Sequence, residues 1–456
     1  MNIEFRTPSK WTSFASRKHV AAVLLAFCFM TVPLSAPAQT AATAAAGPST
    51  IAAATTSQAA VLPPVSSLQL NLKAAVLLEP DTGEVFLSVN ADKALAPASM
   101  TKMMTLYIVQ DKIKKGDISW EDPVTITENA SKTLGSLAFL PQGKKPTVKE
   151  LYISMVLRSS NGSAVALAEY ISGSEQHFVQ WMNQEAGRMG MLHTNYINAS
   201  GLDRSDMPRA YRPESTAENM MSALDAATLV KHIIRDHPEY AEVSTLPSYT
   251  FRESDKLAIE NSNWMLESNK TSTRYKQFAY EGLDGMKTGF TDNAGYCFAG
   301  TAERDGLRLI SVVMGTDSPE KRFTETKKVL DYGFDHLEIK QVIARHSAVQ
   351  GEESLPVKLG QATEVPVALD AAVDFLVPKG SDPAGLAWKT EVNAVELTAP
   401  VEAGTKAGTV TYTYQIQGMD KLQKKTVHLI TTEKVEKASW FTLMVRSVRE
   451  FFSQLF

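Results

Sequence analysis

The sequence predicts an α/β fold in which helices pack on an antiparallel sheet, followed by a small all-β domain at the C-terminal end. Three observations lead to this prediction. Two β-hairpins, near residues 80 and 300, enclose a long run of helical segments. After about residue 336 the helical periodicity gives way to short β-like runs. The chain has 456 residues, of which 44% are hydrophobic, so it can bury the cores of two or three domains.

The first 38 residues have the pattern of a signal peptide. Four basic residues precede the 13-residue apolar stretch 20–32, which is too short to span a bilayer comfortably. Ala36 and Ala38 then give the small-x-small pattern of a signal-peptidase site. An uncleaved signal anchor is the alternative. Residues 39–67 are rich in Ala, Thr, Ser and Pro and predict a flexible linker, so we expect a folded domain to begin at Leu68.

The domain expected over 68–335 opens with a hairpin around the turn Pro80–Gly83. Strands return in a second hairpin over 295–316, and the order strand, helix cluster, strand is typical of an α/β sandwich. Between the hairpins, apolar residues at helical spacing predict five helices. These are expected within 99–116, 147–160, 161–173, 175–190 and 219–240.

Cys297 lies in the second hairpin and remains alone once Cys28 is removed with the signal peptide. The mature chain then has no internal disulfide. Because the surrounding sequence reads as a strand, a buried, unreactive thiol is favoured over a nucleophile.

Residues 336–434 are predicted to form a separate all-β domain, in which Gly, Pro and Asp separate short β-like runs. The runs are 354–360, 373–380, 386–393, 394–401, 408–416 and 425–433.

Residues 435–456 are predicted to form an amphipathic helix that associates with a membrane. Apolar residues between Trp440 and Leu455 recur at helical spacing, and two Arg and one Glu make a membrane crossing unfavourable. The helix is therefore expected to lie in the membrane interface. Docking on its own domain or on a partner chain is the alternative.

The charge balance argues against a nucleic-acid partner. The net charge is −4, and it becomes −7 without the signal peptide, which carries four basic residues and one acid. The eight histidines are scattered, so no metal site or other cofactor is indicated. His232 and His237 lie at the end of a predicted helix and are expected to cap it.

Ser99 and Lys102 form an S-x-x-K motif at the head of a predicted helix. Alone the motif is weak, because a chain of this length contains roughly two by chance. On a helix, however, the two side chains share a face. The helix dipole and burial lower the lysine pKa, and a neutral lysine can take the serine proton for attack on a carbonyl. The backbone N–H of Ser99 can serve as an oxyanion donor.

Two further motifs are weak when taken alone. Ser159 and Asn161 form S-x-N between two predicted helices, where a hydroxyl can relay a proton and an amide can bind a substrate carbonyl. Taken alone, the pair is better explained as an ordinary helix cap. Lys287, Thr288 and Gly289 form K-T-G at the start of the second strand region. The charge of Lys287 and the hydroxyl of Thr288 could bind a carboxylate, and Gly289 would let a ligand approach the backbone closely. An ordinary exposed Lys-Thr-Gly turn is the alternative.

The three motifs occur in this order, at intervals of 60 and 128 residues, each in a suitable structural setting. Together they resemble the low-molecular-mass penicillin-binding proteins, specifically the D-alanyl-D-alanine carboxypeptidases. The resemblance extends from about Leu68 to the C-terminus and includes "ASGLD" (199–203), "DGMKTGFTDNAGY" (284–296) and "VELTAPVEAGTKAGTV" (395–410). It implies a β-lactamase/transpeptidase-like fold for the first domain.

The resemblance also implies a role for each residue. Ser99 would attack the D-Ala-D-Ala bond, release the last D-alanine and form an acyl-enzyme, with Lys102 as general base. Ser159 would help return the proton to the leaving amine, and water would then hydrolyse the ester. Substrate binding would fall to Asn161, Lys287, Thr288 and Gly289, and the oxyanion hole to the backbone N–H groups of Ser99 and Phe290.

The sequence departs from the family pattern at two positions near K-T-G. Phe290 stands where well-known members have His, so the rate or pH profile is expected to differ. Ser262 stands where some relatives have Arg, which would leave carboxylate binding more to Lys287 and Thr288. Residues 204–220 are also expected to form an added loop near the cleft.

The leading hypothesis is a periplasmic enzyme, peripherally attached to the outer face of the inner membrane. It would trim peptidoglycan pentapeptides and be inhibited covalently by β-lactams. The first alternative is a DD-endopeptidase, which uses the same site and is therefore not excluded by the motifs. A serine β-lactamase would need a carboxylate for fast deacylation, and no convincing "E-x-x-x-N" loop is present. A non-catalytic scaffold that binds peptidoglycan is disfavoured by the intact Ser99 and Lys102.

Overall fold

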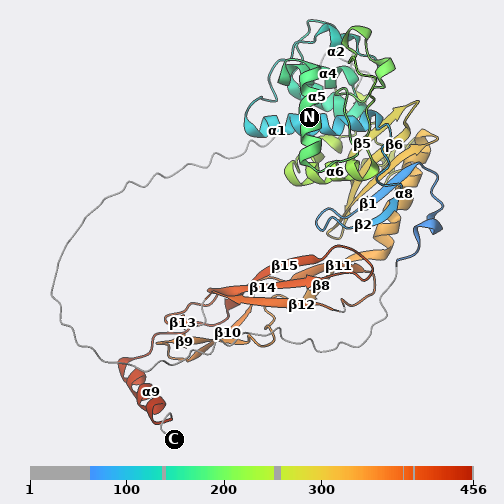
Figure 1. Ribbon diagram of the computed structural model, residues 1–456. Coiled ribbons are helices and arrows are strands. Elements are labelled where there is room, and N and C mark those ends of the chain that lie inside the picture. Colours follow the sequence, from blue (N-terminus) through green and yellow to red (C-terminus); the bar gives the residue numbers. More distant parts are fainter. Residues whose placement is uncertain (1–61, 136–139, 251–257, 384, 394–395, 454–456) are drawn as a thin grey trace, which may run out of the picture. The chain divides into compact units, whose positions relative to one another are not determined.

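The computed structural model describes residues 62–135, 140–250, 258–383, 385–393 and 396–453. The predicted signal peptide, Cys28 and most of the predicted linker lie outside these ranges. The end of that linker, Val65–Leu68, forms a 3₁₀ helix (η1), and Leu62, Val65 and Leu68 pack against the hydrophobic core. The α/β fold with an antiparallel sheet and a C-terminal all-β domain is confirmed (Figure 1).

The sheet of the first domain has five antiparallel strands in the order β2-β1-β7-β6-β5. Both predicted hairpins are confirmed, as β1 (Ala74–Leu78) with β2 (Val85–Val89) and β6 (Gly295–Arg304) with β7 (Leu307–Thr316). The edge strand β5 (Leu283–Thr291) carries K-T-G, so this motif lies in a strand of its own.

The helices cluster beside the sheet, and all five predicted helical segments are confirmed (Figure 1). The fifth segment, predicted within 219–240, becomes helical only at Ala223. The residues before it are extended, since Met220 forms a β-bridge with Asn195 and Met221 forms one with Leu95. The first is preceded by a 3₁₀ turn, η2 (Ala98–Thr101). The α-helices are α1 (Lys102–Lys115), α2 (Glu128–Lys132), α3 (Val148–Arg158), α4 (Asn161–Ser172), α5 (Glu175–Arg188), α6 (Ala223–Asp236) and α7 (Tyr240–Ser244). Shorter elements are β3 (Ser248–Tyr249), β4 (Ile259–Glu260), η3 (Arg204–Asp206), η4 (Arg209–Tyr211) and η5 (Glu267–Thr271).

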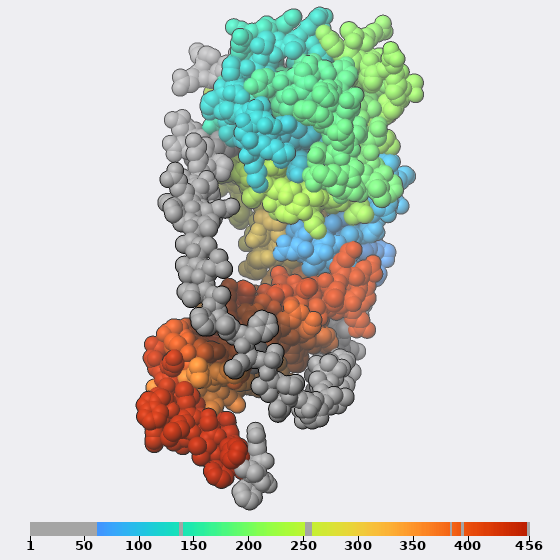
Figure 2. All heavy atoms as spheres, turned by 60° about the vertical axis from the view of Figure 1, so that its left-hand side comes forward, coloured from blue at the N-terminus to red at the C-terminus, as the bar shows by residue number. Residues whose placement is uncertain are grey.

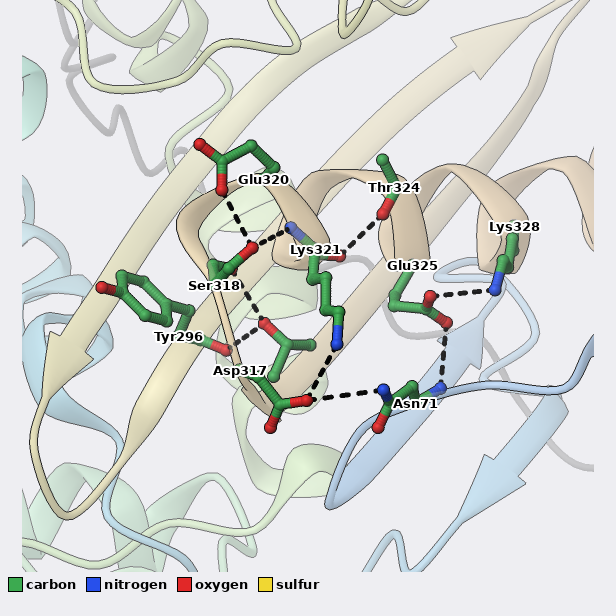
Figure 3. A network of polar contacts seen from close by, with 10 residues as sticks. Asn71, Tyr296, Asp317, Ser318, Glu320, Lys321, Thr324, Glu325 and Lys328 are labelled. Atoms are coloured by element: carbon green, nitrogen blue, oxygen red, sulfur yellow. Dashed lines mark hydrogen bonds and ion pairs between the residues drawn. The ribbon is translucent and has the colours of Figure 1, made fainter.

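Helix α8 (Pro319–His336), which the sequence analysis did not predict, packs on β1, β6 and β7. Ser318 caps its first turn. Asn71, in the segment that leads into β1, donates from its backbone to Glu325 (3.2 Å) and from its side chain to Asp317 (3.4 Å), as Figure 3 shows. These contacts tie the start of the sheet to the N-terminal turns of α8.

Helix α8 lies unusually close to the sheet. A Cβ on Gly333 would lie 2.4 Å from Leu309 and 2.9 Å from Leu77, so only glycine permits this approach. Phe323 on α8 meets the buried Phe298 of β6 edge to face, with 5.3 Å between ring centroids. The position of α8 relative to β1, β6 and β7 is therefore set by close packing.

The C-terminal β domain contains a six-stranded sheet of order β12-β14-β15-β10-β9-β13 and the two-stranded pair β11-β8. Each of the six predicted runs overlaps a strand, whereas β8 and β10 were not predicted. The strands are β8 (Leu337–Ile343), β9 (Ser354–Lys358), β10 (Glu364–Leu369), β11 (Val373–Pro378), β12 (Ala387–Val392), β13 (Leu397–Thr398), β14 (Lys406–Tyr414) and β15 (Gln423–Thr431).

Helix α9 (Trp440–Ser453) ends the described part of the chain. Arg446, on its polar side, donates to the backbone carbonyl of Gly360 (2.8 Å). Its apolar side chains stay at the surface, where α9 is drawn in the deepest red in Figure 2. Within the described ranges, no helix combines the length and the apolar content that crossing a bilayer requires. The exposed apolar residues of α9 are Trp440, Phe441, Met444, Val445, Val448, Phe451 and Phe452.

Candidate active site

The 3₁₀ turn η2 presents Ser99 one turn before α1 begins. Its first residue, Ala98, is buried and has φ = 48°, in the left-handed region that non-glycine residues rarely adopt. Such a conformation costs roughly 1–2 kcal/mol and persists only where the surroundings enforce it. The serine therefore sits on a backbone bend that its neighbours hold in place.

Two glycines allow other backbones to press against this bend. A Cβ on Gly289 of β5 would lie 2.8 Å from the carbonyl oxygen of Pro97. A Cβ on Gly201 would lie 1.9 Å from the carbonyl oxygen of Ala98. The structure thus gives a packing reason for Gly289, whereas its predicted role in admitting a ligand stays a prediction. The same contact brings the K-T-G strand against the turn that bears Ser99.

The S-x-x-K side chains meet as predicted. Lys102 is fully buried, and its Nζ lies 3.0 Å from Ser99 Oγ and 2.6 Å from Asn161 Oδ1. A third contact joins Nζ to the backbone carbonyl of Ser200. Burial, and secondly the positive charge of Lys287, lower the pKa of Lys102 well below its usual value.

These contacts orient the amine. A neutral lysine amine has two N–H groups and one lone pair. The Ser200 carbonyl can only accept a hydrogen bond, and Asn161 also offers its oxygen, because its Nδ2 donates to the Leu134 carbonyl (2.8 Å). Both N–H groups therefore have acceptors, which leaves the lone pair directed at the hydroxyl of Ser99. A base aimed at a nucleophile in this way can activate the serine.

Ser159 lies at the corner between α3 and α4. It ends α3 in the left-handed conformation (φ = 62°), and Ser160 caps α4 by accepting from the Ser163 N–H (3.3 Å). The Ser159 hydroxyl is buried, and among the described residues it has no hydrogen-bond partner. The structure therefore brings Asn161 onto Lys102 but gives Ser159 no direct contact with Ser99 or Lys102.

The K-T-G residues lie on the edge strand β5, and the side chains of Lys287 and Thr288 are buried. Lys287 Nζ donates to the Thr288 carbonyl (3.1 Å), and burial, followed by the Arg322 cation, lowers the pKa of Lys287 to about 7. The hydroxyls of Thr288 and Ser262 lie 3.2 Å apart. Ser262, which stands where some relatives have Arg, is thus a direct neighbour of Thr288.

Phe290 follows K-T-G on the same strand. Its ring is 45% exposed and stacks on Tyr296, with 4.3 Å between ring centroids. Because side chains alternate along a strand, the ring lies on the opposite face of β5 from Gly289 and from the turn η2. The replacement of His by Phe therefore places a hydrophobic ring beside the strand, away from the contact with Ser99.

Two residues near the site were missed by sequence reasoning. Ser200 lies in the quoted "ASGLD" segment, but nothing in the sequence indicated its carbonyl as a partner of Lys102. Arg322 lies on the unpredicted helix α8; its buried guanidinium lies 3.5 Å from the Gly289 carbonyl and 4.7 Å from the centre of the Phe323 ring. Burial lowers the pKa of Arg322 to about 10.

Cys297 is a free, buried thiol on β6, as predicted. Burial raises its pKa to about 11, so at neutral pH it stays protonated and is a poor nucleophile. It pairs in register with Gly289 on β5.

Comparison with known proteins agrees with this geometry. Residues 53–318 match the D-alanyl-D-alanine carboxypeptidase family, Peptidase S11, and residues 338–437 match the C-terminal domain family of penicillin-binding protein 5. The D-alanyl-D-alanine carboxypeptidase DacF of Bacillus subtilis is 32% identical over 346 residues, which are 76% of this chain and 82% of that protein.

Solved structures give the same result. PBP3 of Streptococcus pneumoniae, described as a peptidoglycan synthesis regulatory factor, aligns with a TM-score of 0.68 at 28% identity, covering 80% of this chain and 99% of its own. Penicillin-binding protein D2 of Listeria monocytogenes, in its ampicillin-bound form, aligns with a TM-score of 0.50 at 33% identity. The alignment covers 58% of this chain and 98% of that protein's chain. The family predicted from the three motifs is confirmed: this chain belongs to the Peptidase S11 family of D-alanyl-D-alanine carboxypeptidases.

Proposed function

We propose that this serine D-alanyl-D-alanine carboxypeptidase acts through Ser99 as nucleophile and Lys102 as general base. One observation carries the assignment. The buried Nζ of Lys102, whose pKa is lowered, lies 3.0 Å from Ser99 Oγ while Asn161 and Ser200 accept its N–H groups. A neutral amine in this position can remove the serine proton as the oxygen attacks.

Acylation would proceed in two steps. As Ser99 Oγ attacks the carbonyl carbon of the penultimate D-alanine, its proton passes to Lys102 and the carbonyl oxygen becomes an oxyanion. The backbone N–H groups of Ser99 and Phe290 would stabilise that oxyanion. The C–N bond then breaks, and the leaving amine of the last D-alanine receives the proton from Lys102 through the hydroxyl of Ser159.

Deacylation would reuse the same base. Water attacks the ester carbonyl and gives a proton to Lys102, and the C–O bond to Ser99 breaks as its oxygen regains that proton. The products are the shortened peptide and D-alanine. Ser99 and Lys102 then return to their initial protonation states.

Substrate binding would rest on charge and hydrogen bonding. The terminal carboxylate would be held by Thr288 and by the field of the buried Lys287, with Gly289 keeping β5 close to the serine. Asn161 would bind the acyl part of the peptide. Two buried cationic side chains, Lys287 and Arg322, attract an anion strongly, because the local dielectric constant is low.

We further propose the location and partners. Export through the predicted signal peptide would place the enzyme in the periplasm, where its substrate is the peptidoglycan pentapeptide. The apolar side of α9 would lie on the outer face of the inner membrane. β-Lactams would acylate Ser99, as the ampicillin-bound form of the Listeria relative suggests by analogy.

The experiment combines two readouts on purified protein. Wild type, Ser99→Ala and, as a matched control, Ser88→Ala are incubated with a fluorescent penicillin and with a pentapeptide ending in D-Ala-D-Ala. Ser88 is an exposed serine on β2, at the sheet edge opposite β5. We expect labelling and D-alanine release by wild type and Ser88→Ala, and neither by Ser99→Ala. Labelling of Ser99→Ala would overturn the nucleophile assignment, and labelling without D-alanine release would point to a different substrate.

A further inference from the structure

We propose that Glu175 is a positioning residue for the general base Lys102, acting through the backbone of Ala199 and Ser200. The inference rests on the proposed role of Lys102 and deepens it. Glu175 begins α5 and touches neither Ser99 nor Lys102 directly. It acts on the segment that supplies the third hydrogen-bond partner of the Lys102 amine.

The carboxylate of Glu175 is buried and is used as a fixed acceptor. One oxygen accepts from the Ala199 N–H (3.0 Å), and the other accepts from Asn129 Nδ2 (3.2 Å). The side chain is only 4% exposed, and burial, as the largest cause, raises its pKa. A buried carboxyl group is retained at such a position only where its hydrogen bonds compensate for the lost hydration.

Ala199 is held from both sides. While Glu175 accepts from its N–H, the hydroxyl of Thr105 on α1 donates to its carbonyl (2.8 Å). The next carbonyl along the chain is that of Ser200, which accepts from Lys102. Thr105 lies one helical turn after Lys102, so the same helix holds the segment and carries the base. Side chains from α1 and α5 thus hold this segment at Ala199. Asn198 Oδ1 holds the next two residues by accepting from the N–H groups of Ser200 (3.2 Å) and Gly201 (2.6 Å). Together these contacts fix the direction of the Ser200 carbonyl.

This direction decides what the amine can do. With the Ser200 and Asn161 oxygens accepting both N–H groups of the neutral amine, its lone pair faces Ser99. Without Glu175 the Ala199 N–H loses its acceptor, so the peptide between Asn198 and Ala199 is no longer held to α5 and the Ser200 carbonyl can shift. An N–H of Lys102 would then be released and could point toward Ser99 Oγ, where a donor opposes proton removal.

The chain offers a matched control for the loss of a carboxylate. Glu169 on α4 accepts from the same amide, Asn129 Nδ2 (3.0 Å), and from the Thr127 hydroxyl (2.5 Å). None of its hydrogen bonds reaches Ala199 or Ser200. A general effect of removing a carboxylate at Asn129 would appear in both variants, whereas an effect on Lys102 would appear only at Glu175.

The test measures acylation of the full chain by a fluorescent penicillin under single-turnover conditions. For Glu175→Ala we expect the limiting acylation rate to fall at least about tenfold, with the apparent affinity and the final labelled fraction unchanged. Glu175→Gln keeps an oxygen for the Ala199 N–H and should regain most of the rate. Glu169→Ala should acylate at the wild-type rate.

The proposal is overturned if Glu175→Ala retains the wild-type rate constant. It is also overturned if Glu175→Ala loses only its labelled fraction, as a purely structural role requires, or if Glu175→Gln is as slow as Glu175→Ala. If Glu175→Ala does not fold, Thr105→Val removes the other contact to Ala199. It should slow acylation in the same way, and an unchanged rate there also refutes the idea. Labelling of Ser99→Ala would instead refute the proposed function, whatever the Glu175 variants do.

Discussion

At the residue scale, Lys102 and Lys287 share one environment but need opposite charge states. In the proposed mechanism Lys102 must be neutral to accept a proton, and burial lowers its pKa well below the usual value. Lys287 must be positive to attract a carboxylate, and burial together with Arg322 lowers its pKa to about 7. The free enzyme therefore works only where one lysine has lost its proton and a useful fraction of the other has kept it.

This predicts a bell-shaped pH dependence of kcat/KM for release of D-alanine. Activity should rise with pH as Lys102 becomes neutral, and fall above about pH 7 as Lys287 loses its charge. Lys287→Arg keeps the charge at all accessible pH, so its falling limb should move to higher pH while its rising limb stays. A falling limb that is unchanged in Lys287→Arg would assign it to another group.

Sequence reasoning predicted the pairing of Ser99 with Lys102, which the structure shows. Ser99 and Lys102 could be paired from their spacing, because a helical turn brings residues three apart together. Ser200 and Glu175 could not be found in this way. Ser200 contributes a backbone carbonyl, which every residue has, and Glu175 meets Ala199 only through tertiary packing. Neither contact leaves a pattern in the sequence.

At the scale of elements, the contact between β5 and η2 links two of the three motifs. Gly289→Ala would place a Cβ 2.8 Å from the Pro97 carbonyl oxygen, so strand and turn must separate by a few tenths of an ångström. We expect acylation to fall at least about tenfold and stability to fall by about 1–3 kcal/mol. Acylation kinetics and thermal unfolding measure the two effects.

The control for that change is Gly187→Ala. Gly187 lies within α5, and a Cβ there would have nothing within 4 Å. Alanine in a helix is favoured over glycine, so stability should stay the same or rise by up to roughly 1 kcal/mol, with acylation unchanged. A Gly289→Ala enzyme that acylates as fast as Gly187→Ala would show that the close approach is dispensable.

Elements with strong local patterns were predictable, and those defined by their partners were not. The β1–β2 and β6–β7 hairpins have apolar strands around turn residues, and both are present. Strand β5 contains glycines and polar residues, and its pairing with β6 decides its conformation. Helix α8 had its start signals, Ser318 and Pro319, but its charged first turns obscured the apolar stripe that packs on the sheet.

At the scale of the whole molecule, α9 offers an apolar surface that the described part of the chain leaves exposed. We predict that Val448→Glu, near the middle of that surface, releases the protein from vesicles of mixed zwitterionic and anionic lipid. Burying a valine contributes about 1.5–3 kcal/mol, so the bound fraction should fall at least about tenfold. Flotation of the full chain with vesicles measures the change.

The matched control adds the same charge on the polar side of α9. Ser453→Glu should float with the vesicles nearly as well as wild type. Should Val448→Glu float equally well, the interfacial orientation of α9 would be wrong. The amphipathic pattern over 439–456 could be predicted from the sequence, because the helical spacing of its apolar residues does not depend on contacts with the rest of the fold.

Two buried cationic side chains beside the active site, Lys287 and Arg322, have one more consequence. Their hydrogen bonds go to backbone carbonyl oxygens, so their mutual repulsion is not neutralised by these partners. An anion that enters the cleft relieves that repulsion and thereby favours the folded state. Simple buffer anions should therefore act as weak competitors of the peptide and as thermal stabilisers at once, which makes the choice of buffer part of the enzymology of this protein.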